Sequence, residues 1–308
     1  VEVVGAVGHQ ATVTILGTGL RIGWAPPAPV AGPRALRASG RRDPAVTVPA
    51  MTELDAVFEG RFHGKVALLT GVASGIGKCT ARRLAAEGAS IFGLDIDDEG
   101  MAATVAEVTG AGATMATRRT DVRSVEECRE AVDACVAEYG RIDVLGNIAG
   151  IAAHTNVADV TEEGWDLMNA VNVKGPFFLT QAALPHLIES AGNVVNIASN
   201  AGLMGQAYTV PYCATKGAVV NMTRALAMEF VKTPIRVNAI APGGVKTPLM
   251  DNFQFAADVD FALMSNYTGY RDQSEPEQIA ALFAFVASDE AGNIHGSIIS
   301  ADAGLTAA

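Results

Sequence analysis

Residues 65–77 read KVALLTGVASGIG, and this stretch decides the fold. The apolar run from Val66 to Leu69 is typical of a strand that is buried on both faces of a parallel sheet. The turn that follows is rich in glycine (Gly71, Gly75 and Gly77) and leads into a helical segment. Glycines permit a tight turn there, and the N–H groups at a helix N-terminus bind anions such as a pyrophosphate. The stretch therefore predicts the first strand, turn and helix of a dinucleotide-binding sheet.

A carboxylate ends the next expected strand. Residues 90–94 read as this strand and lead into Asp95, 18 positions beyond Gly77. A carboxylate at this place accepts hydrogen bonds from both ribose hydroxyls and repels a 2′-phosphate. Ile96 follows it and Ser74 is not basic, so the sequence puts no Arg or Lys beside Asp95. These observations favour NAD over NADP, and the alternative is a solvated Asp after an ordinary loop.

Strand and helix patterns alternate along the rest of the chain. We expect helices over 76–88, 100–109 and 124–139, and strands over 114–120, 143–146, 193–198 and 236–240. This alternation predicts an α/β fold, a Rossmann-type doubly wound parallel sheet flanked by helices in a single domain. Ligands of such sheets bind outside the carboxyl ends of the strands. Four polar residues fall at such ends: Asp95, Asp121, Asn147 and Ser199.

A long helical stretch is expected from Thr161, with Asn172 in its middle. Asn is a poor helix former, and the Gly175-Pro176 pair should kink the helix. Asn172 therefore either caps a kink or holds a water or a lysine. Further upstream, Ser124 and Glu127 have the spacing of a capping box at a helix start.

Residues 212–216 read YCATK, and a helical pattern follows over 217–231. Tyr212 and Lys216 are four positions apart, so on a helix they share one face. A positive charge beside a phenol lowers the phenol pKa and makes it a proton donor and acceptor for a carbonyl or an alcohol. Taken alone, the spacing fits a surface Tyr and a solvated Lys better; its context favours catalysis.

Composition excludes several classes of function. The chain has 308 residues, of which 49% are hydrophobic, and a net charge of −11, which argues against nucleic acid or an anionic membrane as partner. No apolar run reaches the ~18 residues of a membrane span. The four cysteines show neither metal-ligand nor disulfide spacing, so we expect no metal and a reduced, cytoplasmic setting.

Residues 1–57 differ from the rest and are expected to form a poorly ordered extension before a domain at 58–308. Residues 1–50 lack lysine, carry five arginines against two acidic residues, and contain the run APPAPVAGP. One hypothesis is that translation starts at Met51 and that the preceding residues are not native. The alternative is an Arg-rich transit segment. The intact mass of the natively expressed protein distinguishes the two.

From about Gly64 onward the chain resembles the single-domain short-chain dehydrogenases/reductases. The matching motifs are TGVASGIG at 70–77, Asp95, Asp121-Val122, NIAG at 147–150, Asn172, Ser199, YCATK at 212–216 and a PGG turn that ends in Thr247. One departure is Asp302-Ala303-Gly304, where the family often has Asp-Gly-Gly. The resemblance implies an NAD(P)-dependent oxidoreductase with the family's fold.

The resemblance also implies roles for individual residues. Tyr212 is the general acid/base, Lys216 lowers its pKa and bonds the nicotinamide ribose, and Ser199 holds the substrate oxygen. Asn172 anchors a water that links Lys216 to solvent, and Asp121 faces the adenine. The cofactor-binding set is Gly71, Ser74, Gly75, Ile76, Gly77, Asp95, Asp121, Val122, Asn147, Ala149, Gly150, Tyr212, Lys216, Pro242, Gly243, Val245 and Thr247.

The expected activity is hydride transfer between NAD(H) and a small or medium apolar secondary alcohol or ketone. Apolar residues after Thr247 could cover the substrate side or could only pack against the core or a neighbouring subunit: Met250, Phe253, Phe255, Phe261, Leu263, Met264, Tyr267 and Tyr270. His154 lies on a loop that could line the pocket, but an ordinary exposed loop histidine is the favoured interpretation. The alternatives are a 3-oxoacyl-thioester (acyl-carrier-protein) reductase that uses NADPH, and a non-catalytic NAD sensor. Family members pair helices between subunits, so we expect a homotetramer, with a dimer as the fallback.

Overall fold

The structure is a computed structural model that describes residues 13–16, 19–22, 58, 60–251, 259–265, 267 and 271–307. The chain divides into two compact units, Val1–Pro49 and Ala50–Ala308. In the first unit, β1 (Val13–Leu16) and β2 (Gly19–Ile22) pair antiparallel. The remainder of the extension expected at 1–57 lies outside the described residues, and the boundary at residue 57 stays a prediction.

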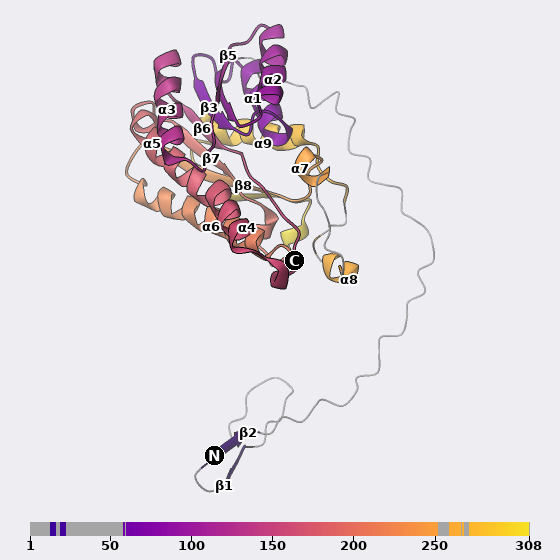
Figure 1. Cartoon of the computed structure of the whole chain (residues 1–308). Helices are drawn as coiled ribbons and strands as arrows, with labels where there is room; N and C mark the ends of the chain where they lie inside the picture. Colours follow the sequence, from indigo (N-terminus) through magenta and orange to yellow (C-terminus); the bar gives the residue numbers. More distant parts are fainter. Residues whose placement is uncertain are drawn as a thin grey trace. The chain divides into compact units, whose positions relative to one another are not determined.

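The second unit is built on a seven-stranded sheet in the order β5-β4-β3-β6-β7-β8-β9 (Figure 1). All neighbouring strands in it are parallel. The strands are β3 (Val66–Thr70), β4 (Ser90–Asp95), β5 (Met115–Arg119), β6 (Val144–Asn147), β7 (Asn193–Ile197), β8 (Arg236–Pro242) and β9 (Ile298–Ala301). The order reverses direction between β3 and β6, which is where such sheets bind ligands. The predicted doubly wound Rossmann-type fold is confirmed.

Helices cover both faces of the sheet (Figure 1). One layer contains α1 (Gly75–Ala86), α2 (Asp98–Gly110) and α9 (Pro276–Ala287), and the other contains α3 (Val125–Tyr139), α5 (Gly175–Glu189) and α6 (Val210–Glu229). The shorter elements are η2 (Val157–Asp159), α4 (Glu162–Asn169), η3 (Ala170–Lys174), η4 (Asn200–Gly202), α7 (Pro248–Asp251), α8 (Phe261–Met264), η5 (Asp289–Ala291) and η6 (Leu305–Ala307). No helix in the described part of the chain is long and apolar enough to cross a membrane.

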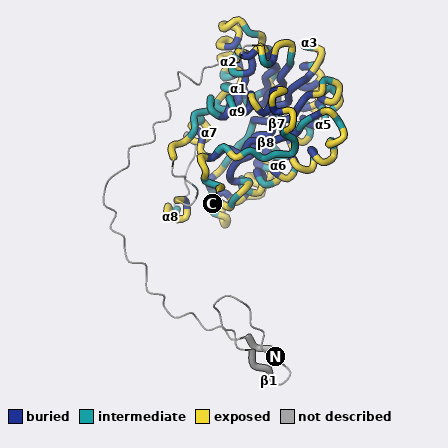
Figure 2. The backbone as a smooth tube through the Cα atoms, turned by 180° about the vertical axis from the view of Figure 1, so that it is seen from behind, coloured by how far each residue is buried: buried dark blue, intermediate teal, exposed yellow. Residues whose placement is uncertain are grey.

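Successive residues of β3 supply the two cores that hold these layers together. Ala67 and Leu69 join the cluster under α1, α2 and α9, whereas Val66 and Leu68 join the cluster under α3 and α5. Successive side chains of a strand point to opposite faces, so a strand buried on both faces must be apolar throughout. Figure 2 shows the resulting pattern, with buried strands between helices whose outer surfaces are exposed.

The long helix expected from Thr161 is divided in a different way from the prediction. A π-helical turn, η3, separates α4 from α5, and Asn172 lies within it. Pro176 opens α5, where a missing N–H does not matter. The irregularity therefore precedes the Gly175-Pro176 pair. Its position is set by Asn172, whose side chain bonds a neighbouring loop instead of continuing the helix, as described below.

The capping box expected at Ser124 forms only in part. The Ser124 hydroxyl accepts from the Glu127 N–H, as predicted. The Glu127 carboxylate does not return to Ser124; it accepts from the N–H of Asp121 at 2.8 Å. The two residues thereby fix the turn after β5 as well as the start of α3. Cys128 and Cys135 are buried on α3, and all four cysteines are free.

Candidate active site

A cavity of about 510 Å³ lies at the carboxyl ends of β3, β4 and β6. It brings together eleven of the predicted cofactor residues: Gly71, Ser74, Gly75, Ile76, Gly77, Asp95, Asp121, Val122, Ala149, Gly150 and Thr247. These residues come from five separate loops of the sheet. The sequence motifs therefore meet where a doubly wound fold is expected to bind a ligand.

The glycine turn forms a backbone cradle at the start of α1. Gly71 has φ +74°, which favours glycine, and a Cβ added at Gly77 would lie 2.0 Å from the Gly71 carbonyl oxygen. The helix can pack this closely on the turn only because position 77 has no side chain. The first residues of α1 line the cavity, and the free N–H groups of a helix N-terminus fit the diphosphate of a dinucleotide.

Asp95 is held in place at the end of β4 by the backbone. Its Oδ2 accepts from the Ala73 N–H at 3.0 Å, and its Oδ1 accepts from the N–H groups of Ile96 at 2.7 Å and Asp97 at 3.1 Å. Each carboxylate oxygen can accept more than one hydrogen bond. The carboxylate is thus oriented at the rim of the cavity with acceptor capacity left for a ligand's hydroxyls.

Two arginines near this end of the cavity escaped the sequence analysis. The pairing of β4 with β5 places Arg119 opposite Asp95, and the Arg119 guanidinium lies 3.6 Å from the Asp98 carboxylate. Arg123 lines the cavity and makes a forked ion pair with Asp121, with Nε 2.8 Å from Oδ2. This ion pair lowers the pKa of Asp121. Neither arginine is a sequence neighbour of Asp95, so strand pairing was the signal needed to find Arg119.

Tyr212 and Lys216 both lie in the first turns of α6, which begins seven residues before the expected start at Gly217. Lys216 is 4% exposed, and its Nζ donates to the Ile197 carbonyl oxygen at 2.8 Å and lies 5.7 Å from the centroid of the Tyr212 ring. Ser199, at the end of β7, makes a side-chain hydrogen bond with Tyr212. The fold therefore brings together Ser199, Tyr212 and Lys216, for which the sequence shows only the order along the chain.

The direction of the shift in the pKa of Tyr212 differs from our expectation. Burial raises the pKa of the phenol, and the hydrogen bond with Ser199 opposes this. Burial also lowers the pKa of Lys216 to about 8. The prediction that Lys216 lowers the pKa of Tyr212 is wrong, because desolvation penalises the charged forms of both groups.

Asn172 links the π-helical turn to the loop after β6. Its Oδ1 accepts from the Ile151 N–H at 2.9 Å, and its Nδ2 donates to the Ile151 carbonyl oxygen at 2.9 Å and to the Thr215 hydroxyl at 3.1 Å. A Cβ added at Gly150 would lie 3.3 Å from Asn172 Oδ1 and 3.5 Å from Lys216 Nζ. Gly150 thus separates the Asn172 amide from the Lys216 ammonium. π-Turns of this kind are frequent at functional sites.

Six predicted cofactor residues are not among those that line the cavity: Tyr212 and Lys216, described above, and four others. Asn147 is buried in the sheet, where its Nδ2 donates to Thr180 and Asn196. Val245 is 5% exposed and belongs to the core. Gly243 donates to Ala301 and packs on Asp302, whose Cα would lie 3.0 Å from an added Cβ. Pro242 ends β8 and is buried.

The substrate side of the site differs from expectation at His154. His154 is 7% exposed, so its interpretation as an exposed loop residue is wrong, and burial lowers its pKa. Its ring packs on Tyr208, at 5.1 Å between centroids. Of the apolar residues expected after Thr247, Phe253, Phe255 and Tyr270 lie outside the described residues. Met264 is buried at 8% exposed.

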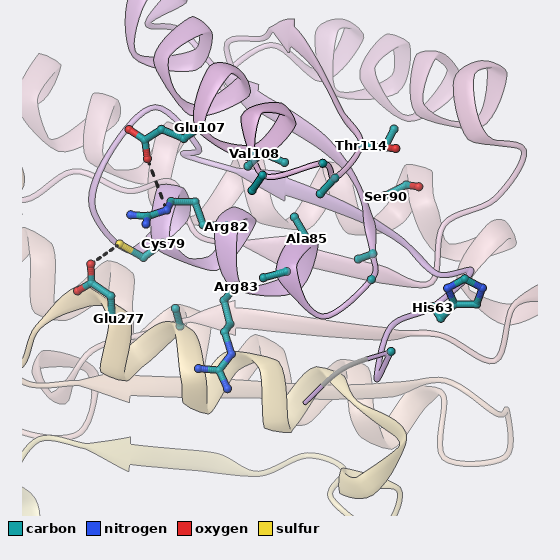
Figure 3. Close-up of a pocket in the computed structure, with 18 residues that line it drawn as sticks. His63, Cys79, Arg82, Arg83, Ala85, Ser90, Glu107, Val108, Thr114 and Glu277 are labelled. Carbon is teal, nitrogen blue, oxygen red and sulfur yellow. Dashed lines mark hydrogen bonds and ion pairs between the residues drawn. The ribbon is translucent and has the colours of Figure 1, made fainter. Parts of the chain in front are cut away.

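A larger cavity of about 980 Å³ lies at the opposite end of the strands (Figure 3). It is bordered by the starts of β4 and β5, at Ser90 and Thr114, and by the last turns of α1 and α2. Figure 3 shows Arg82 paired with Glu107 and Cys79 bonded to Glu277 along its wall. Burial and the Glu277 carboxylate raise the pKa of the Cys79 thiol to about 12, which disfavours the nucleophilic thiolate.

The depressed pKa of Lys216 predicts an unusual pH dependence of stability. Its pKa is about 8 in the folded protein against 10.5 for a free lysine, so between these values the unfolded chain binds more protons. Stability contributed by this residue therefore rises with pH across that window. We expect the free energy of unfolding of the wild type to rise relative to that of Lys216→Met between pH 8 and pH 10. The two free energies of unfolding are measured by urea denaturation. If their difference stays flat or falls between pH 8 and pH 10, the pKa of Lys216 is not lowered by burial.

Comparison with known proteins adds three findings. A family model described as enoyl-(acyl carrier protein) reductase matches residues 71–306. The chain is 38% identical over 246 residues to a 3-oxoacyl-[acyl-carrier-protein] reductase of Thermotoga maritima, covering 80% of this chain and 99% of that protein. It is 36% identical over 247 residues to the meso-2,3-butanediol dehydrogenase of Serratia marcescens, covering 80% and 96% respectively.

A solved structure agrees with these relatives. The crystal structure of a short-chain dehydrogenase from Mycobacterium paratuberculosis bound to NAD superposes with a TM-score of 0.76 at 32% identity. The match covers 81% of this chain and 100% of the other.

Proposed function

Because this chain belongs to the short-chain dehydrogenase/reductase family of oxidoreductases, we propose that it transfers a hydride between NAD(H) and a secondary alcohol or ketone. The observation that carries the proposal is the grouping of three side chains: Ser199 bonds the Tyr212 hydroxyl, and the Lys216 Nζ lies 5.7 Å from the centroid of the Tyr212 ring. We further propose that the substrate is apolar and small or medium in size. Support comes from His154, whose pKa is lowered by burial, and from the burial of the apolar Met264.

The bound nicotinamide would supply or accept the hydride, and the side chains of this protein would handle the proton. In the proposed mechanism Tyr212 gives its phenol proton to the substrate oxygen during reduction and takes it back during oxidation. Ser199 bonds both that oxygen and the phenol, which orients the two groups for transfer. Lys216 is fixed by the Ile197 carbonyl and brings a positive charge to the phenol when protonated. Asn172 holds the Ile151 loop against this group.

The proposal is tested by following the reduced cofactor's fluorescence with NAD and NADP against a panel of secondary alcohols. We expect turnover with NAD and an apolar secondary alcohol. Binding of NAD without turnover of any alcohol or ketone would instead support the NAD sensor considered from the sequence. A clear preference for NADP would overturn the role assigned to Asp95.

Replacing Asp95 tests the cofactor preference. Asp95→Asn keeps the size of the side chain but removes its negative charge. That charge repels a 2′-phosphate, and it also strengthens the hydrogen bonds to the ribose hydroxyls. Hydrogen bonds to a charged group contribute roughly 1.5–3 kcal/mol. We therefore expect the NAD:NADP ratio of kcat/KM to fall by about 10- to 100-fold. The exposed Asp133 on α3 offers the matched control, Asp133→Asn, which should leave the ratio unchanged.

A second candidate is the reduction of a 3-oxoacyl thioester on an acyl carrier protein with NADPH. The 38% identity to the Thermotoga reductase favours it, and so does the position of Arg119 opposite Asp95. The chain's net charge of −11 argues against docking of an acidic carrier. Steady-state rates with a 3-oxoacyl thioester and each cofactor separate the two candidates, since only the second requires efficient use of NADPH.

We also propose that the enzyme works as a cytoplasmic homotetramer, or failing that as a dimer. Large apolar side chains are exposed on the outer helices, among them Phe177 on α5 at 40% and Met228 on α6 at 72%. Surfaces of this kind are often covered by another subunit. Light scattering coupled to size-exclusion chromatography tests the assembly, and a monomer at micromolar concentration would refute it.

A further inference from the structure

Tyr208 has a backbone conformation that few residues with side chains adopt. It lies four residues before Tyr212, and its φ is +64°. A bulky residue in the left-handed region is strained, and such strain persists only where the surrounding structure enforces it. Glycine would occupy this position without strain. The tyrosine side chain must therefore make interactions that a glycine could not.

The contacts of Tyr208 join two other segments to the loop before α6. Its carbonyl oxygen accepts from the Thr155 N–H at 2.7 Å, and its ring lies 5.1 Å from that of His154, at an angle of 38°. These two residues belong to the loop after β6. The Tyr208 hydroxyl accepts from the N–H of Asp260 at 2.8 Å. Asp260 in turn caps α8 through the N–H of Ala262.

A second tyrosine, Tyr267, also attaches the α8 segment to the loop before α6. The Tyr267 hydroxyl donates to the carbonyl oxygen of Ala207 at 2.9 Å, and the Tyr267 N–H donates to the Met264 carbonyl oxygen. The described residues 259–265 and 267 are thus attached at two points to the loop that leads into Tyr212. Both attachments use a tyrosine hydroxyl and a main-chain group.

We propose that Tyr208 is a specificity-determining residue that fixes the substrate-side wall of the site by tying Asp260 and α8 to the loop that carries Tyr212. The inference rests on the proposed alcohol dehydrogenase activity. Tyr208 acts through the position of other residues, so it is a positioning residue and not a catalytic one. The strained backbone is retained because it directs the ring toward His154 and the hydroxyl toward Asp260.

The chemistry of the wall points to the kind of substrate that it selects. It contains the rings of Tyr208 and His154, and burial lowers the pKa of His154, which disfavours the charged imidazolium. Met264, the last residue of α8, is buried. A wall of aromatic rings contacts an apolar substituent on the carbinol carbon favourably. The wall therefore selects by the size and apolarity of that substituent.

Two variants of Tyr208 separate the tether from the backbone strain. Tyr208→Phe removes only the hydroxyl, and its matched control is Tyr139→Phe, which removes a distant hydroxyl bonded to the Ile91 carbonyl oxygen. Tyr208→Gly removes the side chain and relieves the strain. Its control is Ala191→Gly, because Ala191 also has a positive φ, +52°, in the turn between α5 and β7.

The first measurement is amide hydrogen exchange of the peptide that contains Asp260. We expect exchange at the Asp260 N–H to quicken on the order of five-fold in Tyr208→Phe, the factor for loss of one neutral hydrogen bond of about 1 kcal/mol. Tyr139→Phe should leave this peptide unchanged. Equal protection in wild type and Tyr208→Phe would overturn the tether, and this result does not depend on any activity.

The second measurement compares 1-phenylethanol with propan-2-ol as substrates. We expect Tyr208→Phe and Tyr208→Gly to raise KM for 1-phenylethanol several-fold while kcat stays within about two-fold, and to change propan-2-ol little. Ala191→Gly should alter neither. An equal effect on both alcohols, or none, would overturn the specificity role. If the wild type oxidises no alcohol, the proposed function fails, and the exchange experiment still decides whether the tether exists.

Discussion

Tyr212→Phe is expected to lower kcat by about 10²- to 10⁴-fold, the range typical for loss of a general acid/base. The phenylalanine ring fills the same space in the first turns of α6, so folding should be retained. No other described side chain that contacts Ser199 at this position can supply the proton: Asn200 accepts from Ser199, and Ala201 donates only its N–H. The reacting oxygen would therefore exchange its proton with water at a much lower rate.

The measurement is steady-state turnover together with NAD affinity from fluorescence titration. Affinity should stay within about two-fold of wild type, because the cradle of Gly71 and Gly77 is untouched. Tyr139→Phe again controls for removal of a phenol hydroxyl. Near-native turnover of Tyr212→Phe would refute the assignment of Tyr212 as the proton donor. Loss of NAD binding in parallel with turnover would indicate a structural role instead.

Gly77→Ala should have the second largest effect, and it acts on the cradle. The added Cβ would lie 2.0 Å from the Gly71 carbonyl oxygen and 3.1 Å from that of Thr70. Both contacts are with backbone, so no side chain can rotate away. Either α1 must shift from β3 or the turn must open, and overpacking of this kind costs roughly 1–3 kcal/mol or more.

We expect NAD affinity to fall by at least about ten-fold and the melting temperature to fall with it. The control is Gly110→Ala at the end of α2, where nothing lies within 4 Å of an added Cβ. That change should be neutral or slightly stabilising, because Ala is the better helix former. Wild-type affinity and stability in Gly77→Ala would show that the turn is not packed as described.

The fold and the centre of the site were predictable because they depend on local patterns. An apolar strand followed by a glycine turn specifies the β3–α1 unit, and YCATK places two side chains on one helical face. Short-range geometry decided both, so the sequence carried the information in neighbouring positions. The same holds for the buried cysteines of α3, whose seven-residue spacing returns to one face.

What escaped prediction depends on contacts between distant segments. Arg119 reaches the neighbourhood of Asp95 only through the pairing of β4 with β5. His154 lies in a polar-looking loop, and its burial follows from packing on Tyr208. The π-turn at Asn172 arises because the loop at Ile151 offers its backbone groups to that side chain. Desolvation of Tyr212 and Lys216 likewise reflects everything packed around them.

The buried amide side chains of the central strands also fix the strand register on which the site depends. Asn147 and Asn196 are register partners on β6 and β7, and Asn196 passes the chain of hydrogen bonds to Thr223 on α6. Sliding either strand by one residue would bury unpaired amides, at roughly 1–3 kcal/mol for each group. These hydrogen bonds therefore fix the register of β6 with β7, and with it the positions at which the following loops leave the sheet. The spacing between the reactive groups therefore depends on the Asn147–Asn196–Thr223 hydrogen bonds within the sheet and α6.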